Sequence, residues 1–600
     1  MNYTRRSKRT ICLFLCFAMA ILTVACQSNP KEEGQEAMFK PDTYVGTADG
    51  HNGEIKVEVT VDENSIKSIE VIEHNESPGI SDPAIERIPK AIVEDQSLAV
   101  DAISGATVTS DAIIAAVTDA LKQAGADIDA LKVKKDKEQS ARESVEYTTD
   151  VVVIGGGGAG LAAAVSAHQN GAKVILVEKM PRLGGNTILS GGAYNAVDPV
   201  RQKAQGIEDS IEKHFQQTYD GGDKLGNEEL IRTLVENAYP GIEWLESLGM
   251  KFNDEVFTVL GGMWPRAHKP STPLGTGFID TYSKYIDEND NIEIMLDTEA
   301  TEIIMKDGKA AGIKAKGLKE DIVIHANNGV VIAAGGFAGN SKMVNKYNED
   351  WPSLENVKST NHPGATGDGI ILAEDAGASL VGMENLQLLP MGDPETGSLS
   401  GNIEQGVENR IFVNKFGERF VDEGERRDVM TKALLEQEDA YMWVVLDHKN
   451  YPTPETTNNF NETIEELIEQ GRAFKGDTLE ELAEKIDVDP NNLVKAVEEF
   501  NKAVETGGPD AFGRTLFENK IDTAPFYAGR RMPTVHHTMG GIEINTDAQV
   551  LNKDGNVIPG LYAAGEVTGG IHGSNRLGGN ALADITVFGK IAGENAAANK

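Results

Sequence analysis

A glycine-rich turn at residues 155–160, which includes Gly157, Ala159 and Gly160, has the clearest chemical signature in this chain. Apolar residues 151–154 before it predict a buried strand, and residues 161–169 after it predict a helix. Such glycines let the backbone approach a pyrophosphate, and the helix N-terminus supplies N–H groups. Glu178, at the end of a second apolar run, can accept hydrogen bonds from ribose hydroxyls. The pattern therefore predicts a dinucleotide site; the alternative is a glycine-rich turn that binds no nucleotide.

A second glycine-rich passage follows directly and bears on which dinucleotide is bound. It reads Arg182-Leu-Gly-Gly-Asn-Thr-Ile-Leu-Ser-Gly-Gly192 and resembles the loop that lines the isoalloxazine ring in FAD enzymes. Together with Ala333-Ala-Gly-Gly336 it favours FAD, and NAD is the competing ligand.

Residues 38–126 are predicted to form a small α+β unit. Ile55, Val57, Val59 and Val61 alternate with polar residues as in a half-buried strand, and residues 66–72 suggest its partner. Ser110 is expected to be the N-cap of a helix over residues 112–124.

The turn Asp101-Ala-Ile-Ser-Gly-Ala-Thr107 precedes this helix. It resembles the acceptor site at which a flavin transferase attaches FMN covalently, and the hydroxyl of Thr107 would form the phosphoester. The alternative is a plain turn at a helix entry.

The first residues resemble a lipoprotein signal. A basic region is followed by a short apolar run at residues 11–22 and by Thr23-Val-Ala-Cys26. We expect an extracytoplasmic protein anchored to the cell membrane by lipid on Cys26; an uncleaved anchor is the alternative. Cys12, Cys16 and Cys26 are the 3 cysteines, so a processed chain keeps no thiol for an iron–sulfur cluster or a thioether-linked haem.

Length and charge narrow the class of protein. Six hundred residues predict two or three domains. The net charge of −38 argues against nucleic acid as a partner and against electrostatic docking on anionic lipid.

From residue 147 onward the chain resembles the soluble fumarate reductase and urocanate reductase flavoproteins, relatives of the flavoprotein subunit of succinate dehydrogenase. The segments that carry the resemblance are residues 361–369, 535–541, 563–570 and 572–581. Residues 38–126 look like the FMN-carrier domain often fused to such reductases.

The resemblance implies an α/β and α+β multidomain fold: a Rossmann-like FAD-binding domain with an inserted capping domain, preceded by a small α+β FMN-carrier domain. The expected boundaries are a signal peptide at 1–25, a tether at 26–37, the FMN-binding domain at 38–126, a linker at 127–146, the FAD-binding domain at 147–384 and 538–600, and the capping domain at 385–537.

In this family a hydride passes from the FAD N5 to the β-carbon of an α,β-unsaturated carboxylate, and a proton reaches the α-carbon. His537 and Arg576 match the family's carboxylate clamp, and Arg427 matches its proton donor. From the residues alone, Arg426-Arg427-Asp428 would be an ordinary charged surface run. The positions implied for FAD are Gly157, Ala159, Gly160, Glu178, Lys179, Gly185, Asn186, Thr187, Gly191, Gly192, Ala300, Asp368, Glu566, Arg576, Ala581 and Leu582.

The substrate pocket departs from fumarate reductases. Leu389, Asn402 and Ile403 replace the residues that hold the second carboxylate of fumarate, and Tyr194 replaces a Met beside the flavin. An apolar pocket would leave that carboxylate without a partner. We therefore expect acrylate, cinnamate or urocanate, with Glu404 near the imidazole site of urocanate reductases. Glu404, Glu408 or Glu425 would complete the proton relay.

Three alternatives remain open: a genuine fumarate reductase, a 3-ketosteroid-type dehydrogenase, and a flavin electron shuttle without its own substrate. The expected partners of the reductase are a small unsaturated carboxylate, a flavin transferase and a membrane quinol-linked electron donor. Electrons would pass through FMN to FAD.

Overall fold

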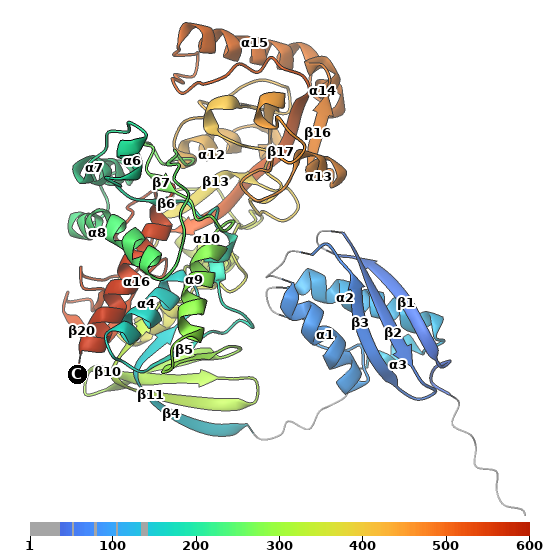
Figure 1. Cartoon of the computed structure of the whole chain (residues 1–600), viewed down its shortest axis with the longest axis vertical. Helices are drawn as coiled ribbons and strands as arrows, with labels where there is room; N and C mark the ends of the chain where they lie inside the picture. Colours follow the sequence, from blue (N-terminus) through green and yellow to red (C-terminus); the bar gives the residue numbers. More distant parts are fainter. Residues whose placement is uncertain (1–36, 51–52, 77–80, 104–105, 134–141, 600) are drawn as a thin grey trace, which may run out of the picture.

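The computed structural model describes residues 37–50, 53–76, 81–103, 106–133 and 142–599, which form a small N-terminal domain and a larger body (Figure 1). The N-terminal domain is an antiparallel sheet in the order β1-β2-β3, covered by helices. Its elements are β1 (Asp42–Asp49), β2 (Glu54–Val61), β3 (Ile66–Glu73), α1 (Asp82–Asp95), α2 (Thr107–Gln123) and α3 (Ile128–Leu131). The alternating valines of β2 are buried against α2, as the sequence pattern predicts.

The start of α2 differs from the prediction that Ser110 is its N-cap. The helix begins at Thr107. The Ser110 hydroxyl donates to the Ala106 carbonyl (2.8 Å) and accepts from the Ile103 N–H (3.0 Å). Ser110 therefore fastens the preceding turn onto the first helical turn, and Thr107 is exposed as the first helical residue.

The predicted linker at residues 127–146 overlaps regular structure at both of its ends. Helix α3 begins at Ile128, and β4 (Glu143–Ile154) begins before the apolar run by which it was recognised. Residues 143–149 pair in parallel with β11 (Glu320–Ile332), and the Arg142 guanidinium donates to the Gly317 carbonyl (2.7 Å). This outer half of β4 is polar and largely exposed, so hydrophobic periodicity does not reveal it.

The larger body is built on an eight-stranded sheet in the order β19-β20-β11-β4-β5-β8, extended by β10 and β9. The parallel pairs of β4 with β5 and β11 confirm the predicted buried strands. The other strands are β5 (Val174–Val177), β8 (Ile292–Met295), β9 (Glu299–Lys306), β10 (Lys309–Lys316), β19 (Gln549–Leu551) and β20 (Val557–Ala563).

Two helices, α4 (Gly158–Gln169) and α16 (Asn580–Ala598), pack closely against each other. Gly589 lies against the Ala159 carbonyl and Gly593 against the Ala163 carbonyl, so the two helices run in the same direction. Residues 158–167 of α4 are all buried, which explains their small side chains. Smaller elements on the body are α5 (Gly185–Leu189), β6 (Tyr194–Asn195), α6 (Arg201–Ala204), α7 (Ile211–Gly221), α8 (Glu228–Ser247), β7 (Ala267–His268), α9 (Thr276–Asp287), α10 (Ser341–Tyr347), α11 (Asp368–Asp375), β12 (Leu380–Val381) and β18 (Gly541–Ile542).

Residues 386–538 contribute a second sheet in the order β13-β17-β15-β14, with β16 also paired to β17. Figure 1 shows the helices of this part toward the top of the view, with α4 and α16 below them. The elements are β13 (Leu386–Gly392), β14 (Ile411–Val413), α12 (Arg427–Leu435), β15 (Met442–Asp447), α13 (Ile464–Glu469), β16 (Ala473–Gly476), α14 (Leu479–Lys485), α15 (Pro490–Thr506) and β17 (Phe526–Thr538).

The helices in the described part of the chain are too short or too polar to cross a membrane. The predicted signal and the lipidation at Cys26 lie outside the described residues. Within the described ranges no cluster of His, Cys, Asp or Glu is arranged to bind a metal ion.

Candidate active site

A cavity of about 1290 Å³ runs between the large sheet and the second sheet. Loops after β4, β5 and β11 line one wall, and β13, α12 and β17 contribute to the other. The predicted FAD residues that line it are Gly157, Ala159, Glu178, Lys179, Gly185, Asn186, Thr187, Gly191, Gly192, Ala300, Asp368, Glu566, Arg576, Ala581 and Leu582. The fold therefore brings most of the predicted FAD residues into one cavity.

Gly160 is the exception among these glycines. It does not line the cavity, and a Cβ at this position would collide with the Gly155 carbonyl. Its lack of a side chain lets α4 approach β4, and contact of Gly160 with the cofactor stays a prediction. By contrast, a Cβ at Gly157 would meet only one atom within 4 Å, at 3.9 Å, and one at Gly191 none.

Two helix N-termini face this cavity without a side-chain cap. Helix α4 begins after Gly157, and α16 begins after Gly579. Uncapped N–H groups and the helix dipole favour negative charge, such as a pyrophosphate or an electron-rich flavin edge. These features fit FAD, because the two termini and the open glycines lie along one continuous cavity.

Glu178 lies at the end of the cavity that we call the adenosine end, which is also lined by Lys179, Glu299 and Ala300. Its carboxylate accepts hydrogen bonds from the Gly156 N–H (2.6 Å) and the Met180 N–H (2.8 Å). Burial raises the pKa of Glu178 despite these bonds. The carboxylate is thus fixed in position at the end of β5, where a ribose would lie.

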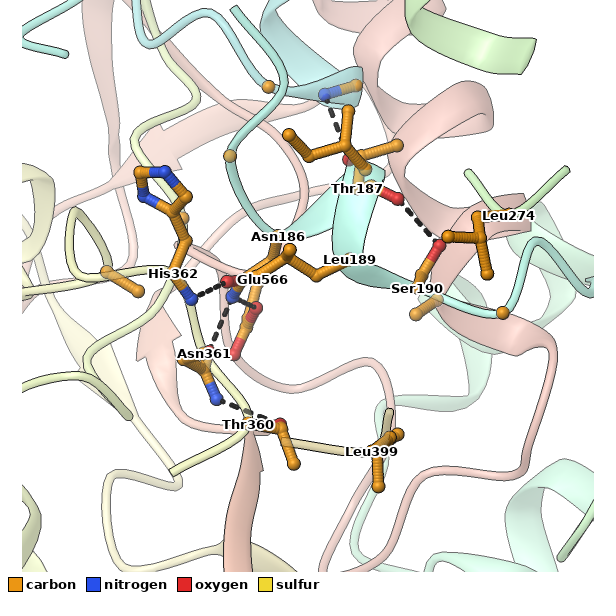
Figure 2. A pocket seen from close by; sticks show the side chains of 18 of the residues that line it. Asn186, Thr187, Leu189, Ser190, Leu274, Thr360, Asn361, His362, Leu399 and Glu566 are labelled. Carbon is orange, nitrogen blue, oxygen red and sulfur yellow. Dashed lines mark hydrogen bonds between the residues drawn. The ribbon is translucent and has the colours of Figure 1, made fainter. Parts of the chain in front are cut away.

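Asn186 forms the centre of a polar network at the middle of the cavity (Figure 2). Its side-chain amide donates to Asn361 Oδ1 (2.5 Å) and Glu566 Oε2 (3.2 Å), and its Oδ1 accepts from the His362 N–H (2.7 Å). Thr187 accepts from the Gly158 N–H (3.1 Å). The network joins both halves of the FAD-binding domain, because Glu566 follows β20.

Arg427, Arg576 and Gln387 meet at the opposite end of the cavity. Gln387 Oε1 accepts from Arg427 Nη1 (3.2 Å) and from Arg576 Nη2 (3.0 Å). The Gln387 amide donates to the Arg576 carbonyl (2.8 Å), and Arg427 also donates to the Leu260 carbonyl (2.8 Å). Gln387 thus holds two buried cations side by side. Sequence reasoning missed it, since the sequence shows only its place beside Leu388 and Leu389, and the structure puts these residues on β13.

Arg576 Nε and His537 Nε2, on two residues that line this part of the cavity, are buried and have no hydrogen-bond partner among the described residues. His537 Nδ1 lies 3.5 Å from Glu566 Oε1. A buried polar atom without a partner is destabilising unless a ligand satisfies it. The geometry therefore provides a site for an anion beside the FAD cavity.

Burial lowers the pKa values of Arg427, Arg576 and His537. Burial, reinforced by Arg576, lowers the pKa of Arg427 well below its ordinary value, while Glu404 opposes the shift. Burial lowers the pKa of Arg576 to about 10. The pKa of His537 is also held well below its usual range by burial and Arg576, so the imidazole is neutral at neutral pH. A neutral imidazole can donate one hydrogen bond, from Nε2 when Nδ1 is unprotonated.

The distal part of the cavity, which would contact the end of the substrate away from its carboxylate, is lined by apolar side chains and by charged side chains that are already paired. Leu389 and Met391 line it, together with Asn402 and Glu404. Glu404 Oε2 is held by Arg410 Nε at 2.6 Å, so Glu404 is not a free carboxylate. Arg472 lies between Asp393 (3.8 Å) and Glu462 (3.7 Å), so two carboxylates already balance its charge.

Tyr194 does not line the cavity, and the prediction that it contacts substrate is wrong. It is fully buried, stacks on Phe278, and donates its hydroxyl to the Ala238 carbonyl (2.8 Å). Its aromatic ring packs in the core of the larger body, in a cluster that includes Phe252.

Thr107 lies in the N-terminal domain, exposed at the first residue of α2, whose N-terminus has no side-chain cap. An exposed hydroxyl at a helix N-terminus suits a phosphoester, because the helix dipole favours the phosphate charge. Ser104 and Gly105 of the predicted acceptor turn lie outside the described residues.

Comparisons with known proteins agree with a larger FAD-binding body and a small N-terminal FMN-binding domain. The model of the FAD binding domain family matches residues 150–582, and the FMN-binding domain model matches residues 50–122. The NADH:acrylate oxidoreductase of Vibrio harveyi is 42% identical over 618 residues, covering 93% of this chain and 61% of that protein. The urocanate reductase of Eggerthella lenta is 38% identical over 567 residues, covering 92% of each chain. The open conformation of a flavocytochrome c3 fumarate reductase matches with a TM-score of 0.63 and 36% identity, covering 76% of this chain and 78% of that structure.

Proposed function

This chain belongs to the FAD-binding flavoprotein reductase family that includes fumarate, urocanate and acrylate reductases, and from this premise we propose that it reduces the carbon–carbon double bond of an α,β-unsaturated monocarboxylate. The proposal rests on two buried donors without partners among the described residues, Arg576 Nε and His537 Nε2. A carboxylate accepts from both and satisfies them. The FMN-binding domain adds the second flavin of this FAD- and FMN-dependent oxidoreductase.

Bound FAD supplies the hydride for the double bond. Arg576 and His537 bind the substrate carboxylate. The hydrogen bonds that they donate become stronger as negative charge develops on it. Gln387 holds Arg576 and Arg427 together, so the proton donor and the carboxylate clamp keep a fixed relation to each other. The lowered pKa of Arg427 makes this guanidinium a stronger acid than an exposed arginine, which supports its role as donor of a proton to the substrate α-carbon.

Two buried charged side chains near Arg427, Glu404 and Arg410, support a route for its reprotonation. Among the three glutamates considered for the relay, Glu404 lines the cavity, and its charge opposes the lowering of the Arg427 pKa. It is paired with Arg410 (2.6 Å), which in turn donates to the Glu423 carbonyl (3.1 Å). Glu425 instead accepts from the neighbouring Arg426 N–H, on the surface.

The distal pocket supports a substrate with one carboxylate and a neutral remainder, as in acrylate or cinnamate. Arg472 is already balanced by two carboxylates, and Leu389 offers no hydrogen bond. A second carboxylate would be buried without a partner, which costs several kcal/mol. Urocanate is less well served than the sequence predicts, because Arg410 occupies one oxygen of Glu404.

A substrate panel tests this proposal. With reduced viologen as donor, the protein carrying both flavins is assayed with acrylate, methacrylate, cinnamate, urocanate, itaconate and fumarate. We expect the best monocarboxylate to exceed fumarate in kcat/KM by at least about tenfold, which corresponds to roughly 1.4 kcal/mol. Fumarate as the best substrate would show that the assignment of Leu389 and Arg472 is incorrect. No turnover of any enoate would contradict the proposed function itself.

We further propose that Thr107 carries FMN covalently, attached by a flavin transferase, and that FMN passes electrons to FAD from a membrane quinol-linked donor. The exposed hydroxyl at the start of α2 and the match to the FMN-binding domain support the first step. The proposed location outside the cytoplasmic membrane, with lipid on Cys26, is supported by the sequence pattern of the first residues.

Replacing Thr107 with Val should abolish covalent FMN without loss of FAD. The intact mass measured from cells that contain the transferase should then lack the increase of one FMN, whereas Thr107→Ser should retain part of it. Thr118→Val is the matched control, because Thr118 lies on the same helix with its hydroxyl on the Ile114 carbonyl (2.6 Å). FMN retained in Thr107→Val would place the attachment elsewhere.

A further inference from the structure

The N-terminal domain contributes to the wall of the FAD cavity. Residues His74, Asn75 and Glu76, which follow β3, line the same cavity as Glu178 and Lys179. The neighbouring helix α1 contacts Asp297, two residues before Glu299, which places this part of the domain at the adenosine end. Figure 1 shows the N-terminal domain beside the larger body, with α1 on the side turned toward it.

An ion pair fastens the two domains beside this wall. Arg87 on α1 lies 2.9 Å from the carboxylate of Asp297, whose side chain is 18% exposed. Asp297 is part of the loop after β8. Two backbone hydrogen bonds join this loop to residues 178–180 at the adenosine end. The Asp297 N–H donates to the Met180 carbonyl (3.1 Å), and the Thr298 N–H donates to the Glu178 carbonyl (2.8 Å).

A second pair of opposite charges lies across the same boundary. Asp82, the first residue of α1, raises the pKa of Arg182, although burial of Arg182 has the larger and opposite effect. Arg182 itself lines the cavity. The ion pair at Asp297 and the electrostatic attraction between Asp82 and Arg182 thus both lie at the boundary where the N-terminal domain meets the cavity.

The wall-forming loop is also anchored inside the N-terminal domain. The carboxylate of Glu76 accepts a short hydrogen bond from the Thr109 hydroxyl, in the first turn of α2. The loop that lines the FAD cavity is therefore fixed to the helix that begins with Thr107.

We propose that the FMN-binding domain closes the adenosine end of the FAD cavity and, held there by the Arg87–Asp297 pair, increases the affinity of the chain for FAD. In this arrangement the domain that carries one flavin is part of the binding site of the other. The inference does not depend on which enoate is reduced, because it concerns cofactor binding alone.

The test measures FAD affinity of the full-length chain by equilibrium dialysis, with noncovalent FAD quantified chromatographically so that FMN does not interfere. The variants are Arg87→Glu, Asp297→Lys and the double replacement. Each single variant should weaken FAD binding by about three- to tenfold, since a partly exposed ion pair contributes up to about 1 kcal/mol and reversal adds repulsion. In the Asp297→Lys background, Arg87→Glu should restore affinity instead of reducing it further.

The double-mutant cycle separates docking from two other effects. Long-range electrostatics alone predicts that Asp297→Lys binds the anionic FAD more tightly, which is the opposite result. Asp297 has φ 50°, so Lys there adds backbone strain, but the strain is common to the single and double variants and cancels in the cycle. Arg232→Glu is the control for charge reversal at a surface ion pair away from the boundary. Unchanged FAD affinity in Arg87→Glu, or effects that simply add in the double variant, would overturn the proposal.

Discussion

Replacement of Arg427 by Ala is expected to lower kcat for enoate reduction by about 10³- to 10⁴-fold, the upper range for removing a general acid. The expectation follows from its position: Arg427 is buried in the cavity, adjacent to Arg576 through their shared contact with Gln387. Its pKa is lowered, so the guanidinium donates a proton more readily than an exposed arginine does. FAD binding should be retained, because Arg427 contacts Leu260 and Gln387 and lies far from the adenosine end.

Single-turnover measurements separate loss of the acid from loss of structure. The dithionite-reduced variant should remain reduced when substrate is added, yet reoxidise with ferricyanide as the native protein does. Arg426→Ala is the matched control, since the neighbouring guanidinium binds Asp223 and Asp428 at the surface. Electron transfer to a soluble acceptor with no substrate turnover by the native protein would instead favour a flavin shuttle. Rapid enoate reduction by Arg427→Ala would remove Arg427 from the mechanism.

Local patterns in the sequence predicted the part of the fold that local interactions determine. The apolar runs at 151–154 and 174–177 are buried parallel strands, and the glycine-rich turn between them leads into α4. The family resemblance then placed Arg427, His537 and Arg576 in one cavity, although they lie far apart in the chain. Neither periodicity nor composition contains that information, because it depends on how β13, α12 and the segment before α16 pack together.

The residues that the sequence missed or misplaced depend on contacts of that kind. Gln387 binds Arg576 across 189 positions, and nothing in its neighbourhood distinguishes it from another buried residue of a strand. Tyr194 was assigned to the flavin by position, but its ring turns into the core toward Phe278. Gly160 belongs to the dinucleotide motif, yet it packs against the Gly155 carbonyl and does not line the cavity.

Replacement of Arg576 by Lys is expected to lower kcat/KM by about 10²- to 10³-fold, comparable to removal of one preorganised donor from an oxyanion site. Lys keeps the positive charge but lacks the Nε donor that has no other partner, and it cannot bind Gln387 and a carboxylate with one planar fork. Because the substrate carboxylate is bound before and during reduction, KM should rise as well as kcat fall.

Binding of a saturated product acid, followed through the FAD absorption spectrum, provides a measurement that does not depend on turnover. Its Kd should rise in Arg576→Lys and in His537→Ala, because each variant removes one of the two donors without partners. Arg266→Lys is the control for an altered buried arginine: Arg266 is fully buried, pairs with Asp209 (2.8 Å) and lies outside the cavity wall. It should reduce thermal stability and leave Kd unchanged. If product binding were equally tight in Arg576→Lys, the carboxylate would have to be bound by other groups, and the orphaned donors would no longer explain the substrate class.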